Sequence, residues 1–315
     1  MKPIRLAYVN VIMQCAVYGA SFIALKMIID ANLPAFAIIF MRFSLGYLVL
    51  LSAKLCLSKR KAFHFFDFTA FSKEELIAGI STGLALFLAY MFQTFAGETT
   101  TPARIGLFTD LFIIFTPIAS MINKRKFKIK PLIAAVIAFI GVLVVSNTFF
   151  GKMNFVIGDF LAVLCALSFT FHFLFVEKNT SQKFSIKPID PMNFTLIQFL
   201  TVITIAFFAT IYTTDYNKPV NIDINIIISL LFLGIPSTAL TFFSQFSVQK
   251  IISASRISFL YSFESVFATF FSVVWGYDDF KLNLIIGTLM LVFATVLITI
   301  KYSQLKHMFK RRSKL

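Results

Sequence analysis

The chain has 315 residues, of which 58% are hydrophobic and only 14% charged, and its mean hydropathy is +0.86. A soluble domain has about 25% charged residues, so this composition excludes a protein that covers its surface with polar groups. The net charge of +15 would indicate nucleic-acid binding in a soluble chain. Here, however, the basic residues gather in short loops and in the tail, as in cytoplasmic loops of membrane proteins, and we expect no nucleic-acid partner.

Ten apolar segments follow one another along the chain, and most are long enough to cross a hydrocarbon layer of about 30 Å as a helix. The first follows two basic residues, as in a signal peptide, but it lacks a small-residue cleavage site, and we interpret it as a membrane helix. We therefore predict an all-α polytopic membrane protein with ten transmembrane helices. The segments are residues 6–29, 34–57, 76–97, 101–123, 131–149, 157–177, 192–213, 225–249, 253–276 and 282–301.

The distribution of Lys and Arg predicts the orientation of these helices. With the N-terminus inside, 23 basic residues lie on the cytoplasmic side and 5 on the opposite side. Because cytoplasmic loops are enriched in basic residues, we expect both termini in the cytoplasm (N-in/C-in). The three cysteines show no metal-ligand spacing, so we expect neither a metal site nor a disulfide.

The sequence contains an internal duplication. Residues 99–146 and 251–299 align at an offset of 152, which places Arg104 on Arg256, and one inserted residue changes the offset to 153. Each half then holds five helices, and an odd number inverts the second copy relative to the first. Inverted repeats are an architecture of secondary transporters, with the substrate site near the membrane midplane. The predicted divisions are a first repeat over 1–150, a second over 151–301 and a basic cytoplasmic tail over 302–315.

Short motifs in this order resemble the EamA-type transporters of the drug/metabolite transporter superfamily. The resemblance covers nearly the whole chain, with Tyr18 in place of the usual tryptophan and Ser265 in place of the usual proline. It implies transport of a small organic solute by alternating access, and amino acids or related metabolites as the substrate class. The motifs are YGASFIALK at 18–26, FMRF at 40–43, the stretch 93–117, GDFLA at 158–162, SASR at 253–256, FESVF at 263–267 and the glycine at 287.

Two carboxylates lie near the middle of predicted membrane helices. Asp110 lies nine residues into the fourth helix and Glu264 eleven residues into the ninth, which is about 13 Å and about 16 Å from opposite faces. Both depths are close to the midplane, and an ionisable group there indicates a functional site. One interpretation is that Asp110 and Glu264 bind a substrate cation or a coupling proton. The other is that they only accept hydrogen bonds that hold helices together, and both interpretations stay open.

Other polar and aromatic residues could line a pathway. Arg104 and Arg256 lie near helix ends on opposite sides, which suits gates as well as side chains that reach the interface. Gln93 and Gln245 flank the same ends, as gate residues or as links between helices. His172 is a candidate proton relay, since its ordinary pKa is near neutrality. Further candidates for the pathway are Tyr18, Ser21, Tyr90, Tyr261 and Trp275, whereas the many Phe residues are assigned to lipid contact or packing.

No nucleotide-binding loop, metalloprotease motif or nucleophile–base series occurs in the sequence, so we expect no cofactor and no enzyme activity. The leading hypothesis is a secondary transporter, driven by a solute or proton gradient. Two alternatives are an intramembrane enzyme that uses the midplane carboxylates, and a solute channel. The expected partners are a small-molecule solute and the lipid bilayer. The chain could also assemble as a homodimer. The resemblance is mostly to bacterial proteins, so we expect the bacterial inner membrane.

Overall fold

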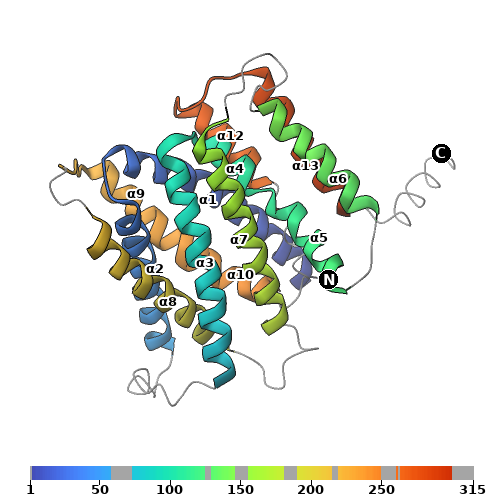
Figure 1. Cartoon of the computed structure of the whole chain (residues 1–315). Coiled ribbons are helices and arrows are strands. Elements are labelled where there is room, and N and C mark those ends of the chain that lie inside the picture. Colours follow the sequence, from blue (N-terminus) through green and yellow to red (C-terminus); the bar gives the residue numbers. More distant parts are fainter. Residues whose placement is uncertain are drawn as a thin grey trace.

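The computed structural model describes residues 2–57, 73–124, 129–145, 155–180, 190–214, 219–249, 260–261 and 263–299. Every regular element in these ranges is a helix (Figure 1). The first half holds α1 (Lys2–Asp30), α2 (Ala35–Leu57), α3 (Lys73–Thr99), α4 (Pro102–Thr109), α5 (Phe112–Lys124) and α6 (Ile129–Val145). The second half holds α7 (Ile157–Thr180), α8 (Pro191–Thr213), α9 (Ile224–Gly234), the π-helix η4 (Ile235–Leu240), α10 (Thr241–Gln249), α12 (Phe263–Val274) and α13 (Leu282–Thr299).

Seven helical segments are long and apolar enough to cross a membrane, and three more apolar helices in the described ranges are shorter. Many large apolar side chains on their outer faces are exposed, among them Phe139, Phe208 and Phe270. Helices that are apolar on all sides suit a hydrocarbon surrounding rather than water. The chain is therefore a polytopic integral membrane protein, while the count of ten spans and the position of the termini stay predictions.

The predicted fourth helix, 101–123, is interrupted at Asp110. α4 ends at Thr109 and α5 begins at Phe112. Across the break the amides of Leu111 and Ile113 bond to carbonyls three residues earlier rather than four, at 3.2 and 3.0 Å. Such tight turns rotate the following helix relative to the preceding one. The interruption places the Asp110 side chain at a helix end in the middle of the apolar span.

The predicted eighth helix, 225–249, contains a second irregularity. The chain passes from α9 into the π-helix η4 and then into α10, and Pro236 lies within η4. Proline has no amide hydrogen, so it leaves a carbonyl of the preceding turn without its helical partner. The Thr238 hydroxyl donates to the carbonyl of Leu233 at 2.7 Å. The helix is thus distorted around Pro236, whereas α5 continues as a helix through Pro117.

Helices of the two halves pack in reciprocal pairs. α6 packs on α13, and α2 packs on α8, so each of these helices contacts its own counterpart. α3 packs on α7 and α8, and the segment α9–η4–α10 packs in the same way on α1 and α2. α12 packs on α1 and α4, and α4 and α5 pack on α7. Every pairing between the halves in this series therefore has an equivalent with the halves exchanged.

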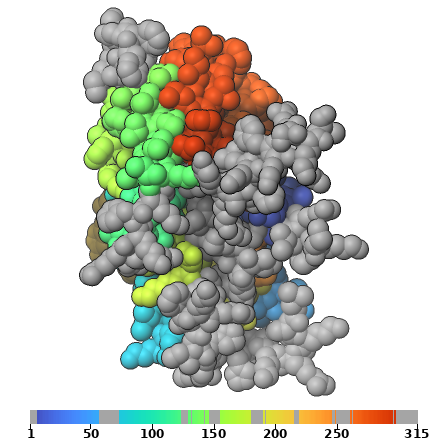
Figure 2. Space-filling view, turned by 90° about the vertical axis from the view of Figure 1, so that its right-hand side faces the viewer, coloured from blue at the N-terminus to red at the C-terminus, as the bar shows by residue number. Residues whose placement is uncertain are grey.

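Two glycines allow α6 and α13 to approach closely. A Cβ atom added at Gly141 would lie 3.1 Å from the carbonyl oxygen of Gly287, and one at Gly287 would lie 2.8 Å from that of Gly141. Small residues at such positions are typical of helix contacts within membranes. The two helices lie side by side in Figure 1 and form the upper part of the face seen in Figure 2.

Candidate functional site

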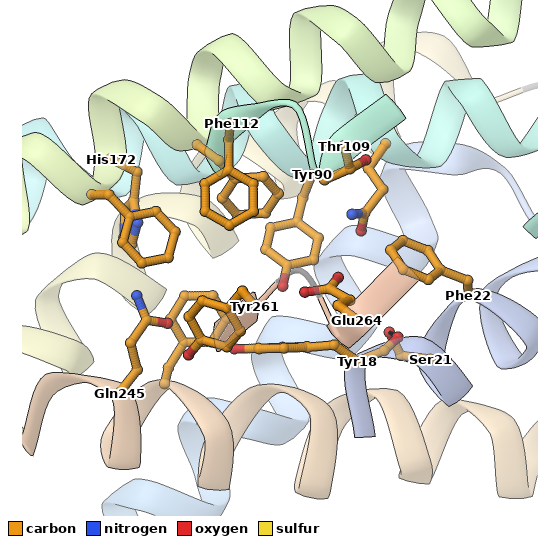
Figure 3. A pocket seen from close by; sticks show the side chains of 14 residues that line it. Tyr18, Ser21, Phe22, Tyr90, Thr109, Phe112, His172, Gln245, Tyr261 and Glu264 are labelled. Carbon is orange, nitrogen blue, oxygen red and sulfur yellow. Dashed lines mark hydrogen bonds between the residues drawn. The ribbon is translucent and has the colours of Figure 1, made fainter. Parts of the chain in front are cut away.

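A cavity lies between the two halves, and residues from seven helices line it (Figure 3). Helices α1, α3, α4, α5, α7, α10 and α12 contribute to its wall, so both halves are needed to form it. The lining residues are Tyr18, Ser21, Phe22, Tyr90, Gln93, Thr109, Phe112, Phe169, His172, Phe173, Phe242, Gln245, Tyr261 and Glu264.

Eight of the twelve residues selected from the sequence line this cavity. α1 and α3 contribute two each, α7 and α10 one each, and the remaining two lie in α12 or just before it. Four of the eight are aromatic or histidine side chains on different elements, so the cavity joins residues that are far apart in the sequence. The eight are Tyr18, Ser21, Tyr90, Gln93, His172, Gln245, Tyr261 and Glu264.

Glu264 supplies the carboxylate of the cavity wall. It lies in the first turn of α12, and the residue is only 8% exposed. Within the described part of the chain, its carboxylate makes no hydrogen bond and no ion pair, although Asp110 and Arg42 are near enough to interact electrostatically. In Figure 3 the carboxylate lies between the side chains of Tyr90 and Tyr18. A buried carboxylate that faces a cavity in this way is available to a ligand.

Asp110 lies beside the cavity rather than on its wall. The residue is 1% exposed, and its Oδ2 atom accepts the backbone N–H of Ser265 at 3.0 Å. The other carboxylate oxygen is buried without a hydrogen-bond partner among the described residues. Ser265 follows Glu264 in the first turn of α12, where backbone N–H groups lack helical acceptors. Asp110 therefore holds the end of α12 from the interruption between α4 and α5.

Arg42 of α2 is a buried cation that is near enough to Glu264 to interact with it electrostatically. Its Nε atom donates to the hydroxyl of Thr238 at 2.6 Å, and Nη2 donates to the hydroxyl of Ser237 at 2.7 Å. The guanidinium also lies 4.4 Å from the centre of the Tyr90 ring, a distance typical of a cation–π contact. Arginines within membrane helices generally pair with polar neighbours. The neighbours themselves could not be predicted, because they belong to the π-helix of the other half.

His172 faces the cavity from α7. The residue is 1% exposed, and neither ring nitrogen makes a hydrogen bond of good geometry with a described residue, although the Gln198 side chain is near enough to interact with the ring. The rings of Phe169, Phe173 and Phe242 meet it edge-on at centroid distances of 6.5, 5.8 and 6.1 Å. A buried polar group is normally hydrogen-bonded. The His172 ring therefore has at least one nitrogen that a ligand or water in the cavity could satisfy.

Gln14 is a site residue that the sequence analysis missed. The Tyr261 hydroxyl donates to its side-chain oxygen at 2.5 Å, and its amide donates to Asn10 at 2.5 Å and to Ser244 at 3.1 Å. These bonds fix the Tyr261 ring on the cavity wall and connect α1 to α10. A glutamine within an apolar helix was the available signal, since intramembrane polar residues commonly bond across helices.

Arg104 is part of a buried cluster between the halves. It forms an ion pair with Asp159 of α7, whose side chain is fully buried, and its Nε atom donates to Oδ1 at 3.0 Å. Asp159 also accepts the hydroxyl of Thr100 at 2.8 Å and the backbone N–H of Val156 at 3.0 Å. These contacts bind the start of α4 to the start of α7. The sequence analysis selected Arg104 as a candidate, whereas Asp159 was named only as part of the motif GDFLA at 158–162.

The remaining two candidates do not join the cavity. Trp275 is 56% exposed and borders a separate apolar groove between α1, α9 and α12. Arg256 lies outside the described residues. The structure thus brings neither of them to the central site.

Five phenylalanines on the cavity wall were not expected, because all Phe residues were assigned to lipid contact or packing. The chain has 42 of them, and a residue so frequent along apolar helices gives no periodic signal for one inner surface. The phenylalanines on the wall come from both halves of the chain. The packing of the helices decides which Phe side chains face the cavity. They are Phe22, Phe112, Phe169, Phe173 and Phe242.

Comparison with known proteins matches both halves to one family model. The model described as the EamA-like transporter family matches residues 5–147 and again residues 156–300. The chain is 25% identical over 287 residues to a protein of Archaeoglobus fulgidus described as an uncharacterized transporter, and the match covers 90% of this chain and 83% of that protein. A solved crystal structure with 16% identity covers 95% of this chain and 97% of its own, with a TM-score of 0.66. That likeness concerns the fold alone.

Proposed function

Since the chain belongs to the EamA-like transporter family, we propose that it is a secondary transporter that moves a small organic metabolite across the membrane by alternating access. The observation that supports this proposal is the central cavity, whose wall requires both halves. In inverted-repeat transporters the substrate site lies near the midplane between the repeats, and rocking of one unit against the other exposes it alternately to each side. The reciprocal packing of the halves suits such an exchange.

Two irregular segments support the same proposal. The break at Asp110 and the π-helix at Ile235–Leu240 occur within apolar spans. In membrane proteins, irregular backbone at this depth is tolerated where it is buried in protein or lines a cavity, and such sites commonly bind substrate. Thr109 and Phe112, on either side of the break, both line the cavity. The interruption therefore borders the central cavity rather than the lipid-facing surface.

Proton coupling is part of the proposal. Asp110 and Glu264 are buried carboxylates that interact with one another, and intramembrane carboxylates are common in proton relays. The basic loops support cytoplasmic termini, and the mostly bacterial resemblance supports the bacterial inner membrane. Amino acids or related metabolites are the expected substrate class from the family resemblance.

The enzyme and channel alternatives have less support. An acid–base pair would need both carboxylates to reach one reacting atom. Here one oxygen of Asp110 is bonded to the Ser265 amide, and Asp110 does not line the cavity. A channel does not need two equivalent halves that exchange roles, so the reciprocal packing of the halves favours a transporter.

Counterflow in proteoliposomes tests the transporter proposal. The purified chain is reconstituted with a mixed internal pool of metabolites, and uptake of labelled external solutes is followed with and without a pH gradient. A carrier gives saturable uptake that an internal unlabelled solute accelerates, and it returns the solute unchanged. Flux without saturation would indicate a channel, and a new product would indicate an enzyme. Absence of exchange for every pool would contradict the proposal.

A further inference from the structure

A second hollow lies on the membrane-facing surface of the bundle, away from the central cavity. It is a groove of about 320 Å³, which is within the range of small-molecule sites, roughly 300–1,000 Å³. Helix α1 packs on both α9 and α12, and side chains of these three helices, together with Trp275, line the groove. None of the residues that line it also lines the central cavity. The groove is therefore a separate site.

The groove has a buried floor and exposed edges. Ile23 and Ala24 of α1 are buried beneath it, whereas Ile228 of α9 and Trp275, just beyond the end of α12, are exposed beside it. The Phe271 ring packs edge-on against the Trp275 ring, with the centroids 6.1 Å apart. An empty space here would leave the floor without contacts on one side and would forfeit dispersion energy, so we expect the groove to be filled.

The lining of the groove is apolar, and the serine and asparagine side chains in it already have partners. The Ser229 hydroxyl donates to the Met27 sulfur at 3.8 Å, and the Asn225 amide donates to the Asp223 carboxylate at 3.2 Å. No charged side chain is among the described residues that line the groove. Its occupant is therefore held by apolar contact along its length.

The groove extends from one membrane interface towards the midplane. The Asn221 amide donates to the Ala31 carbonyl at 3.2 Å, so the end of α1 and the start of α9 lie on the same side. Trp275 marks the interface there, where tryptophan is enriched in membrane proteins. From Asn225 to Phe232 the groove follows seven residues of α9, or about 11 Å. One leaflet contributes about 15 Å of the hydrocarbon core, so the groove lies within a single leaflet.

We propose that this groove binds one acyl chain of a membrane phospholipid, in the leaflet in which α1 ends. The head group lies at the level of Trp275 and Asn225, and the chain runs inward along α1 and α9 towards Phe232. Phospholipid is the molecule that the membrane supplies at this depth, and its acyl chain extends from the interface towards the midplane as the groove does. The lipid site does not depend on which solute the central cavity carries.

Fluorescence of Trp275 tests the proposal, because it is the only tryptophan in the chain. The full chain is purified in detergent and freed of lipid, and phosphatidylcholine with bromine atoms in the upper part of one acyl chain is added. Bromine quenches tryptophan only at close contact. We expect quenching that saturates at about one lipid per chain and is reversed by the same lipid without bromine, as for a single site. Chance contact within the micelle would instead increase in proportion to the lipid fraction.

Two variants locate the lipid in the groove, and both keep Trp275 as the reporter. Ala20→Phe places a ring in the space of the acyl chain, because Ala20 lines the groove, and it should lower the affinity about tenfold or more. Ile228→Ala removes exposed contact surface at the edge, and the affinity should fall about fourfold for each methylene group that loses contact. The matched control is Val136→Phe, which adds the same ring on the exposed face of α6 and should leave quenching unchanged.

Three results would overturn the proposal. They are quenching that never saturates, absence of quenching, and saturable quenching whose affinity is unchanged in the two groove variants. If Ala20→Phe does not fold, Ile228→Ala still decides the outcome, because its side chain is exposed. If brominated lipid does not reach Trp275 and light scattering shows a dimer, a second copy of the chain covers the groove instead. Counterflow in the same preparation is a separate measurement, so failure of the lipid site leaves the transporter proposal in place.

Discussion

Asp110 and Ser265, which are 155 positions apart in the sequence, are joined by a hydrogen bond of 3.0 Å from the Ser265 backbone N–H to the Asp110 carboxylate. The bond connects the interruption between α4 and α5 in the first half to the first turn of α12 in the second. Glu264, whose side chain lines the cavity, directly precedes Ser265 in the chain. The pair therefore connects the broken helix to the helix that carries Glu264.

Variants of Asp110 separate its charge from its hydrogen bond. Asp110→Asn keeps a carbonyl oxygen that can accept the Ser265 N–H, so folding should be preserved, while the response of counterflow to a pH gradient should be lost. Asp110→Leu removes the acceptor and should lower the stability by about 1–3 kcal/mol, since it leaves a buried amide without a partner. Proteoliposome exchange and thermal unfolding in detergent measure the two effects. An unchanged pH response in Asp110→Asn would assign the residue to helix packing.

The buried pair of Arg104 and Asp159 should be important for stability. Asp159→Asn leaves the guanidinium in a largely buried position without its charge partner, which is expected to cost about 3 kcal/mol or more. The double variant Arg104→Gln/Asp159→Asn should recover part of this loss, because no unpaired charge remains. Thermal unfolding of the single and double variants forms a double-mutant cycle. Additive losses would show that the two side chains do not interact.

The α6–α13 contact should not tolerate a larger residue at Gly287. The Cβ atom of Gly287→Val would lie 2.8 Å from the Gly141 carbonyl oxygen, which is closer than such atoms pack. Overpacking of this kind costs roughly 1–3 kcal/mol. Leu289→Val is the control, since Leu289 is on the same helix with its side chain exposed. Equal melting temperatures of the two variants in detergent would contradict the close contact.

Asp223 should stabilise α9 in a pH-dependent way. Its carboxylate accepts the backbone N–H of Ile226 at 2.9 Å, and this bond lowers the pKa of Asp223 below its usual range. The stabilisation is therefore present above the pKa of the unfolded chain and is lost as the pH falls through the lowered folded pKa. Asp223→Ala should reduce the stability of the protein, because it removes the side chain that caps the N-terminus of α9.

Asp223→Asn serves as the matched variant for that measurement. Asparagine also caps helices, so the stability near neutral pH should be kept, while the acid dependence at this position should disappear. Thermal unfolding over a range of acidic pH values tests both variants. A steeper acid dependence in Asp223→Asn than in the unmodified chain would contradict the assignment.

Much of the site follows from single positions in the sequence. Glu264 and His172 could be selected because a polar group in an apolar helix is expensive and seldom present without a use. The repeat that aligns residues 99–146 with 251–299 is a property of the chain alone, and it predicted a cavity formed by both halves. The apolar segments likewise determined the fold class, because segments of this length and composition are stable in the hydrocarbon core of a membrane and not in water.

Tertiary structure alone decided which of these residues meet. The partners of Arg42 lie in a π-helix nearly two hundred positions away, and Arg104 is paired with Asp159. Asp110 faces the Ser265 amide instead of the cavity, because α4 ends one residue before it. The sequence shows which polar and charged side chains are unfavourable to bury. Which hydrogen-bond or ion-pair partner stabilises each of them depends on which helices pack together. That pairing is a property of the folded bundle and not of any segment.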